Sequence, residues 1–184
     1  MLLRIDLKIF VFLILFYLTK QIELYATIMV LCIIHELGHV VMGIIMGMKI
    51  DKIEVMPFGL SVSFKVNIDD YNKKIKKGKI LQIKKIAIAA AGPFTNLLML
   101  LIVLNANINF KIVSNEVLAY ANILMMLFNL LPIYPLDGGR ILKELIHIFE
   151  GSIKSKIYIR KVGRAFIIFL TMIGSVAKKK KKNI

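Results

Sequence analysis

Residues 22–48 read IELYATIMVLCIIHELGHVVMGIIMGM, a long apolar run with two histidines and a glutamate near its middle. Its length suits a membrane-spanning helix, which needs about 20 mostly apolar residues. Helical residues four apart lie on one face, so the spacing places His35 and His39 one turn apart on the same face. Because charge is costly in lipid, three ionisable groups within five residues of such a helix indicate a functional site.

The pentapeptide from His35 to His39 has the H-E-x-x-H spacing of zinc hydrolases. Both imidazoles can point at one metal ion, and Glu36 can reach a water on that ion as general base. A core histidine satisfied by a hydrogen bond would explain one such residue, but it does not explain the whole cluster. We therefore predict His35 and His39 as metal ligands and Glu36 as the catalytic residue.

A catalytic zinc ion requires a third protein ligand and one open coordination position. The chain contains only one further histidine, His147, and it lies in a basic stretch. Asp51 and Glu54 are less attractive candidates, because they follow the predicted metal-binding helix too closely and lack an equivalent scaffold. The third ligand is therefore expected from a segment that is distant in the sequence.

Asp137 is the best candidate for this third ligand. Pro132 and Pro135 precede it and are expected to end or unwind the helix before it, while Gly138 and Gly139 follow it and let the backbone approach closely. That arrangement can direct a carboxylate back into a helix bundle. The alternative is an ordinary turn or N-cap aspartate.

The whole chain has the composition of a membrane protein. Its 184 residues fit one domain, 58% of them are hydrophobic, and the mean hydropathy is +0.76. The apolar residues come in blocks, which excludes an ordinary soluble domain. We expect an all-α, multi-pass integral membrane protein with a bundle of about five to six transmembrane helices. The predicted segments are residues 7–19, 22–48, 86–104, 116–131 and 165–177.

The net charge of +15 reflects lysines and arginines that flank the apolar segments. They do not form a patch with interleaved aromatic residues, so we expect the lipid bilayer, and no nucleic acid, as the partner of these charges. Ten basic residues lie in 49–85 and seven in 137–164, against one in 105–115. The positive-inside rule then assigns 49–85 and 137–164 to the cytoplasm. The predicted active site therefore opens toward the cytoplasmic side.

The C-terminal tail departs from this alternation. A fifth span over residues 165–177 would carry five lysines, 178–182, to the outer side. Either this short segment only dips into the interface, or the chain is truncated where a sixth helix should begin. We expect a membrane-embedded domain over residues 1–177 and a Lys-rich tail over 178–184.

Residues 52–66 have a different pattern, in which apolar residues recur mostly at every second position around Pro57-Phe58-Gly59. This alternation predicts a small membrane-associated β-hairpin that lies against the helices or beside the metal. An edge strand there could bind an extended peptide by strand addition; an ordinary membrane-surface loop is the alternative. The Lys-rich residues 69–85 are expected to form a solvated loop.

Three motifs in order resemble the site-2 protease family (peptidase family M50) of intramembrane zinc metalloproteases. They are His35–His39, the Ala-Ala-Gly-Pro-x-x-Asn stretch that ends at Asn96, and Asn129-Leu-Leu-Pro-Ile-Tyr-Pro-Leu-Asp137-Gly-Gly-Arg. The small size and the lack of a PDZ-type insertion resemble the sporulation branch of that family, the stage IV FB proteins. That branch usually has six spans and a C-terminal CBS domain, and this chain shows neither clearly.

The resemblance implies a metalloendopeptidase (EC 3.4.24) with one Zn²⁺ per chain, held by His35, His39 and Asp137, with Glu36 as base. Asn129 would contact substrate backbone or the oxyanion; an interhelical hydrogen bond is the equally weighted alternative. The implied substrate is a membrane-associated protein precursor, of the kind of an inactive sporulation sigma factor (pro-sigma-K type). The resemblance also implies inhibitory membrane partners.

Two other functions fit the same residues. One is a metal-binding membrane protein without protease activity, either an impaired truncation or a regulator. The other is a transporter with a metal site, which would favour ligands on several spans and internal repeats. The sequence shows no repeat, and its candidate ligands lie on two segments.

Overall fold

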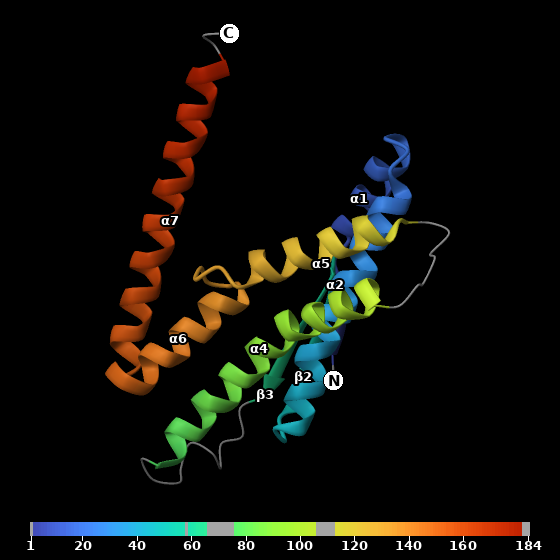
Figure 1. The fold of residues 1–184 in the computed structure, drawn as a ribbon. Helices are drawn as coiled ribbons and strands as arrows, with labels where there is room; N and C mark the ends of the chain where they lie inside the picture. Colours follow the sequence, from blue (N-terminus) through green and yellow to red (C-terminus); the bar gives the residue numbers. More distant parts are fainter. Residues whose placement is uncertain (1, 58, 66–75, 106–112, 182–184) are drawn as a thin grey trace.

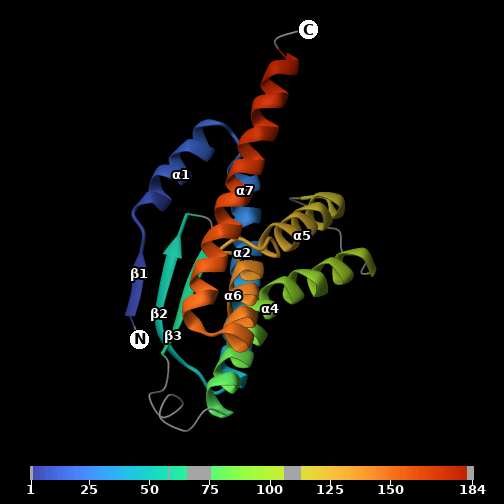
Figure 2. The ribbon, with the colours of Figure 1, turned by 90° about the vertical axis from the view of Figure 1, so that its left-hand side faces the viewer.

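The computed structural model describes residues 2–57, 59–65, 76–105 and 113–181, which form six helices and one small sheet (Figure 1). Helix α2 (Ile22–Ile45) lies at the centre. The sheet lies on one side of it and helices α4 (Lys76–Asn105) and α5 (Asn115–Asn129) lie on the other (Figure 2). The predicted, mainly helical architecture is thus confirmed. The sheet has three strands, whereas the sequence predicted only a two-stranded hairpin.

Helix α2 follows the short apolar helix α1 (Lys8–Leu18) after a tight turn in which Lys20 has a positive φ of 57°. The ring of Phe16 on α1 stacks on Tyr25 of α2, with 4.8 Å between the ring centroids. At its other end α2 stops before Gly47, whose φ of 72° favours glycine. The predicted segment 22–48 is therefore a helix over all but its last three residues.

The sheet has the strand order β1-β2-β3. Strands β2 (Lys49–Met56) and β3 (Gly59–Lys65) form the predicted antiparallel hairpin, with Ile53 opposite Val62. Strand β1 (Leu2–Ile5) adds in parallel to β2, which the sequence did not indicate, since four residues at the N-terminus show no clear alternation. Strands β1 and β3 are the two edge strands of the described sheet, and each has one edge without a paired strand among the described residues.

The hairpin packs directly against α2. The hydroxyl of Tyr25 donates a hydrogen bond of 2.8 Å to the carbonyl oxygen of Pro57 at the hairpin bend. A side chain at Gly43 would overlap the ring of Phe64, so the absence of a side chain there lets β3 approach the helix. These contacts place the free edge of β3 beside the helix that bears the two histidines.

Helix α4 begins earlier than expected. Residues 76–85 are helical, so the prediction of a solvated loop over 69–85 is wrong for this part, while 69–75 lie outside the described residues. Leu81 and Gln82 are buried, because apolar residues alternate with lysines here at a spacing that gives a helix one packed face. The lysine stems can cover apolar surface while their ammonium groups stay in water.

The last three helices run in sequence from the centre to the periphery. In α5, the hydroxyl of Ser114 accepts a hydrogen bond from the backbone N–H of Val117 and so caps the helix. A turn over residues 130–136, with a cis peptide bond before Pro135, leads into α6 (Asp137–Glu150). The predicted segment 165–177 belongs to a single longer helix, α7 (Ser152–Lys181), which projects away from the bundle (Figure 1).

Two helices in the described part of the chain are long and apolar enough to cross a membrane, residues 22–45 and 79–105. Only 22% and 39% of their most apolar windows are buried inside the protein. Apolar side chains such as Leu37, Val41 and Ile44 face outward, as expected for helices surrounded by lipid rather than by protein. The remaining spans of the expected five to six stay a prediction.

Candidate metal centre

Helix α2 presents His35 and His39 on the face that looks into the bundle. Their exposed fractions are 5% and 3%, whereas their neighbour Leu37 is exposed on the opposite face. Glu36 lies between these faces and is half-buried. This is the arrangement that the helical period predicts for an H-E-x-x-H motif.

Asp137 is the first residue of α6, and its side chain is 4% exposed. Leu136 occupies the N-cap position, so Asp137 is not the capping residue. A side chain at Gly138 would overlap the carbonyl oxygen of Leu130, and one at Gly139 would overlap the backbone of Ile133. The two glycines therefore let the preceding turn fold tightly onto α6, and this fixes the direction of the Asp137 carboxylate.

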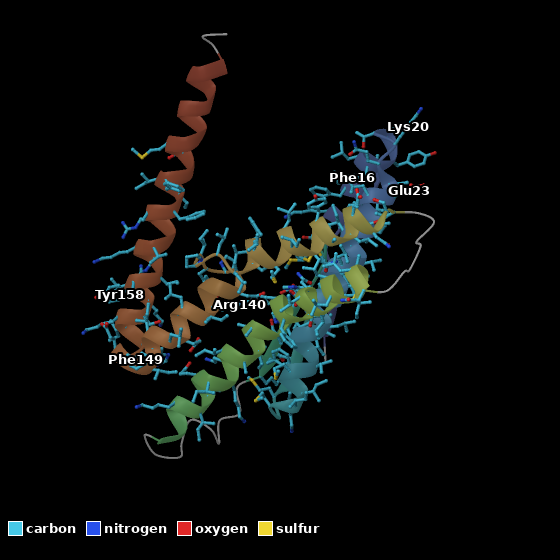
Figure 3. The ribbon with its side chains drawn as sticks, viewed as in Figure 1. Phe16, Lys20, Glu23, Arg140, Phe149 and Tyr158 are labelled. Atoms are coloured by element: carbon cyan, nitrogen blue, oxygen red, sulfur yellow. The ribbon has the colours of Figure 1, made fainter. Side chains whose placement is uncertain are left out.

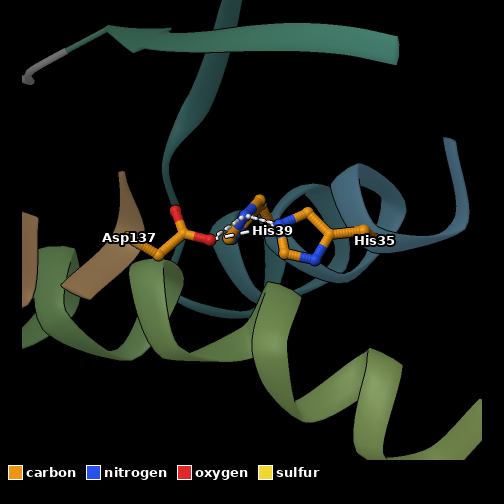
Figure 4. Close-up of side chains that lie close together, drawn as sticks. All are labelled: His35, His39 and Asp137. Atoms are coloured by element: carbon orange, nitrogen blue, oxygen red, sulfur yellow. Dashed lines mark hydrogen bonds and ion pairs between the residues drawn. The ribbon is translucent and has the colours of Figure 1, made fainter. Parts of the chain in front are cut away.

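The three side chains converge on one point (Figure 4). The Oδ2 atom of Asp137 lies 3.1 Å from Nε2 of His35 and 3.2 Å from Nε2 of His39. The two Nε2 atoms are 3.2 Å apart. Two imidazoles from α2 and one carboxylate from α6, 102 residues away from His35, thus form a compact buried triangle.

This triangle fits a tetrahedral zinc ion. Zinc binds histidine nitrogen and carboxylate oxygen at about 2.0–2.1 Å, so the donor atoms of a tetrahedral site lie about 3.3 Å from one another. The observed separations of 3.1–3.2 Å are close to that value. The donor set, two histidines and one carboxylate, is also a known set for a catalytic zinc with an open fourth position.

Neighbouring groups orient these donors. Nδ1 of His39 donates a hydrogen bond of 2.7 Å to the carbonyl oxygen of Ile88 on α4, which leaves Nε2 free to bind a metal. The guanidinium of Arg140 lies 3.7 Å from Oδ1 of Asp137, so the second carboxylate oxygen remains directed at the histidines. Nδ1 of His35 is buried and has no hydrogen-bond partner among the described residues.

Gly92 on α4 lies against both imidazole rings. A side chain there would overlap the ring atoms of His39 and approach Cε1 of His35 to 2.7 Å. Gly92 belongs to the Ala-Ala-Gly-Pro-x-x-Asn motif, whose sequence alone did not indicate this contact. The Gly-Pro pair could have indicated this contact, because a glycine inside a helix often allows another group to approach the backbone closely.

Replacement of Gly92 by alanine is expected to displace the imidazole rings and to lower the zinc content of the purified protein severalfold. The control is Gly163→Ala on α7, because a side chain there meets no atom within 4 Å. Both changes favour a helix by about 1 kcal/mol, so the comparison isolates the steric effect. Metal analysis measures the outcome; full zinc occupancy in Gly92→Ala would show that the rings can move aside.

The other candidate residues have partners outside this triangle. Asn129 ends α5 half-buried, and its Nδ2 donates to the carbonyl oxygen of Met125 in its own helix. His147 and Glu144 form an ion pair at 3.6 Å. On the sheet, Asp51 and Glu54 pair with Lys65 and Lys52, respectively.

Asn96, the last residue of the Ala-Ala-Gly-Pro-x-x-Asn motif, is one helical turn beyond Gly92 on α4. Its side chain is 1% exposed, and both of its polar atoms lack a hydrogen-bond partner among the described residues. Buried amides are costly when unpaired. Asn96 therefore places a buried amide without a partner among the described residues one turn from the glycine that contacts the histidines.

A buried His-His-carboxylate triangle within apolar helices, beside a glutamate, defines a membrane metalloprotein with a hydrolase-type ligand set. Comparison with known proteins identifies the family within this class. Residues 23–113 and 111–172 match Peptidase family M50, which covers most of the chain. The chain belongs to peptidase family M50.

Individual relatives agree with this assignment. A zinc metalloprotease of Methanocaldococcus jannaschii is 28% identical over 82% of this chain and 42% of the relative. Stage IV sporulation protein FB of Bacillus subtilis is 27% identical over 68% of this chain and 41% of the relative. The chain thus spans less than half the length of these curated relatives.

A solved structure shows the same fold. The site-2 protease from Methanocaldococcus jannaschii superposes with a TM-score of 0.69 over 96% of this chain and 81% of that chain, at 22% identity. The similarity extends across both sides of α2, because it includes nearly all residues of the present chain. The arrangement of the sheet and helices around the histidines is therefore that of a site-2 protease.

Proposed function

We propose that this chain is an intramembrane zinc metalloendopeptidase that hydrolyses a peptide bond of a membrane-associated protein. The observation that supports this most strongly is the convergence of His35, His39 and Asp137, with Glu36 next to the first ligand on α2. Membership of family M50 supports the same activity. We further propose that His35, His39 and Asp137 hold one Zn²⁺ and that residues 1–177 form the membrane-embedded protease domain.

The chemistry divides between the bound ion and the chain. A zinc ion held here would supply Lewis-acid activation of water and of the scissile carbonyl. Glu36 would take the proton from the attacking water and pass it to the leaving amine as the carbon–nitrogen bond breaks. The role of Asn129 in holding substrate backbone or the oxyanion remains a prediction; its Nδ2 carries a second N–H besides the one that it donates to the carbonyl oxygen of Met125.

The substrate must reach the site in an extended form, because a helix hides its amide groups in internal hydrogen bonds. Strand β3 packs against α2 and is an edge strand of the sheet, so it could pair with such a segment by strand addition. We propose a membrane-bound precursor protein as the substrate class. Similarity to the stage IV sporulation protein FB favours, as the finer proposal, an inactive sporulation sigma factor of the pro-sigma-K type, with inhibitory membrane partners.

The site is proposed to open toward the cytoplasm. The basic stretch 49–85 follows α2, and the basic stretch 137–164 begins with α6; these are the two helices that bear His35, His39 and Asp137. The positive-inside rule favours the cytoplasm for both stretches. Water would then reach Glu36 from that side.

The test is cleavage of a precursor peptide by the purified full chain in proteoliposomes, before and after removal of zinc by a chelator. We expect cleavage that is lost on chelation and restored by added Zn²⁺. Bound zinc without cleavage would favour a metal-binding protein that is not a protease. Zinc flux across the vesicle without cleavage would favour a transporter.

A further inference from the structure

A cavity of about 340 Å³, with both polar and apolar lining residues, lies between the edge strand β3 and helices α4 and α6. Its polar and charged lining residues are Ser61, Ser63, Lys85, Tyr134, Arg140, Lys143 and Glu144. Figure 3 shows Arg140 on the part of α6 that adjoins α4. The ligand set described above does not use this cavity.

The cavity adjoins the metal centre at two points. Arg140 lines it and also lies 3.7 Å from Oδ1 of Asp137. Ile88 lines it as well, and the carbonyl oxygen of this residue accepts the hydrogen bond from His39. A peptide whose scissile bond lies at the metal centre would therefore place a neighbouring side chain in the cavity.

The lining has an excess of positive charge. Lys85, Arg140 and Lys143 are cationic, whereas Glu144 is the single anion among the residues that line the cavity. The Oε1 atom of Glu144 is 3.9 Å from Nζ of Lys85 and 4.0 Å from Nζ of Lys143, so it is shared between two lysines. These distances exceed those of charge-assisted hydrogen bonds, which leaves both ammonium groups able to donate to a further acceptor.

Glu144 itself is too buried to receive a ligand. Its side chain is 8% exposed, and its other carboxylate oxygen, Oε2, pairs with His147. The two lysines and Arg140 are a third to nearly half exposed, so they face the open part of the cavity. Cations that surround a partly enclosed space attract anionic groups more strongly than the same cations on an open surface.

Resting on the proposed function, we propose that this cavity selects substrates with an acidic side chain close to the scissile bond. Lys143 and Lys85 would donate to the carboxylate, with the hydroxyls of Ser61 and Ser63 on β3 as further donors. Arg140 remains at Asp137 and adds to the potential. Because strand residues advance about 3.3 Å each, the acidic residue is expected within about three residues of the cleaved bond.

The test uses a cleavable precursor peptide with Glu, Gln or Lys placed in turn at each of the three positions on either side of the cleaved bond. At one position at least, the wild-type chain is expected to cleave the Glu peptide about tenfold faster in kcat/KM than the Gln peptide, and the Lys peptide more slowly still. Tenfold is the size expected for one added hydrogen bond between charged groups. Equal kcat/KM for all three peptides at every position would overturn the proposal.

Charge reversal at the cavity gives the sharper result. Lys143→Glu is expected to invert the preference, so that the Lys peptide becomes better than the Glu peptide. The matched control is Lys156→Glu, which makes the same change on an exposed part of α7 outside the cavity lining and should leave the preference intact. An unchanged preference in Lys143→Glu would refute the role of this lysine.

Two further measurements separate the competing explanations. The first is binding of the same Glu and Gln peptides to Glu36→Gln protein, which tests the cavity even if no peptide is cleaved. Failure of the proposed protease activity is therefore distinguishable from failure of this inference. Repeating the assay in neutral and in anionic vesicles tests for headgroup binding. A charge effect that follows vesicle composition and not peptide sequence would overturn the proposal.

Discussion

Replacement of Glu36 by glutamine is expected to abolish measurable peptide cleavage while the protein keeps its zinc. Glutamine has nearly the same size but cannot accept the proton of the attacking water, and loss of a general base typically lowers the rate by about 10²–10⁴-fold. Zinc should remain, because Glu36 is outside the triangle of donor atoms. Cleavage rate and zinc content per chain, measured on the same preparation in proteoliposomes, give the two readouts.

The matched control is Glu23→Gln, which makes the same change in the first turn of the same helix, twelve positions before His35. This variant should cleave at the wild-type rate. Turnover by Glu36→Gln near the wild-type rate would refute the assignment of the base, and loss of zinc from it would show that Glu36 supports the metal site instead.

Replacement of Asp137 by asparagine is expected to weaken zinc binding by at least about 100-fold. Loss of a residue that only orients a metal ligand typically costs about 10–100-fold in affinity, so loss of a direct ligand should cost at least as much. Asp137 supplies an oxygen that lies 3.1 and 3.2 Å from the two imidazole nitrogens, so it would be a direct ligand with the only negative charge in the set. Competition with a zinc chelator of known affinity measures the change.

Asp51→Asn is the control for this prediction. Asp51 was the other aspartate near the metal-binding helix in the sequence, and the structure pairs it with Lys65 on the sheet at 3.4 Å. Its replacement should leave zinc affinity unchanged. If Asp137→Asn also keeps wild-type affinity, the third ligand must be sought elsewhere and the protease proposal loses its main support.

Most helices could be predicted because long apolar blocks in this chain are local signals. Helices α2 and α5 lie where the blocks at 22–48 and 116–131 were found. The start of α4 was missed, because its lysines resemble a solvated loop until Leu81 and Gln82 are seen to pack on one face. Strand β1 was missed for a different reason, since its pairing with β2 joins residues about 50 positions apart.

The sequence alone determined that His35 and His39 share one helix face with Glu36 beside them, because the helical period forces this arrangement, and it thereby predicted the metal-binding pair and the base. It also singled out Asp137 through the prolines and glycines around it. Only the tertiary structure decided that this carboxylate reaches the histidines, that Gly92 leaves room for their rings, and that the carbonyl oxygen of Ile88 orients His39. Such contacts depend on how separate helices pack, and a backbone carbonyl has no signature in the sequence.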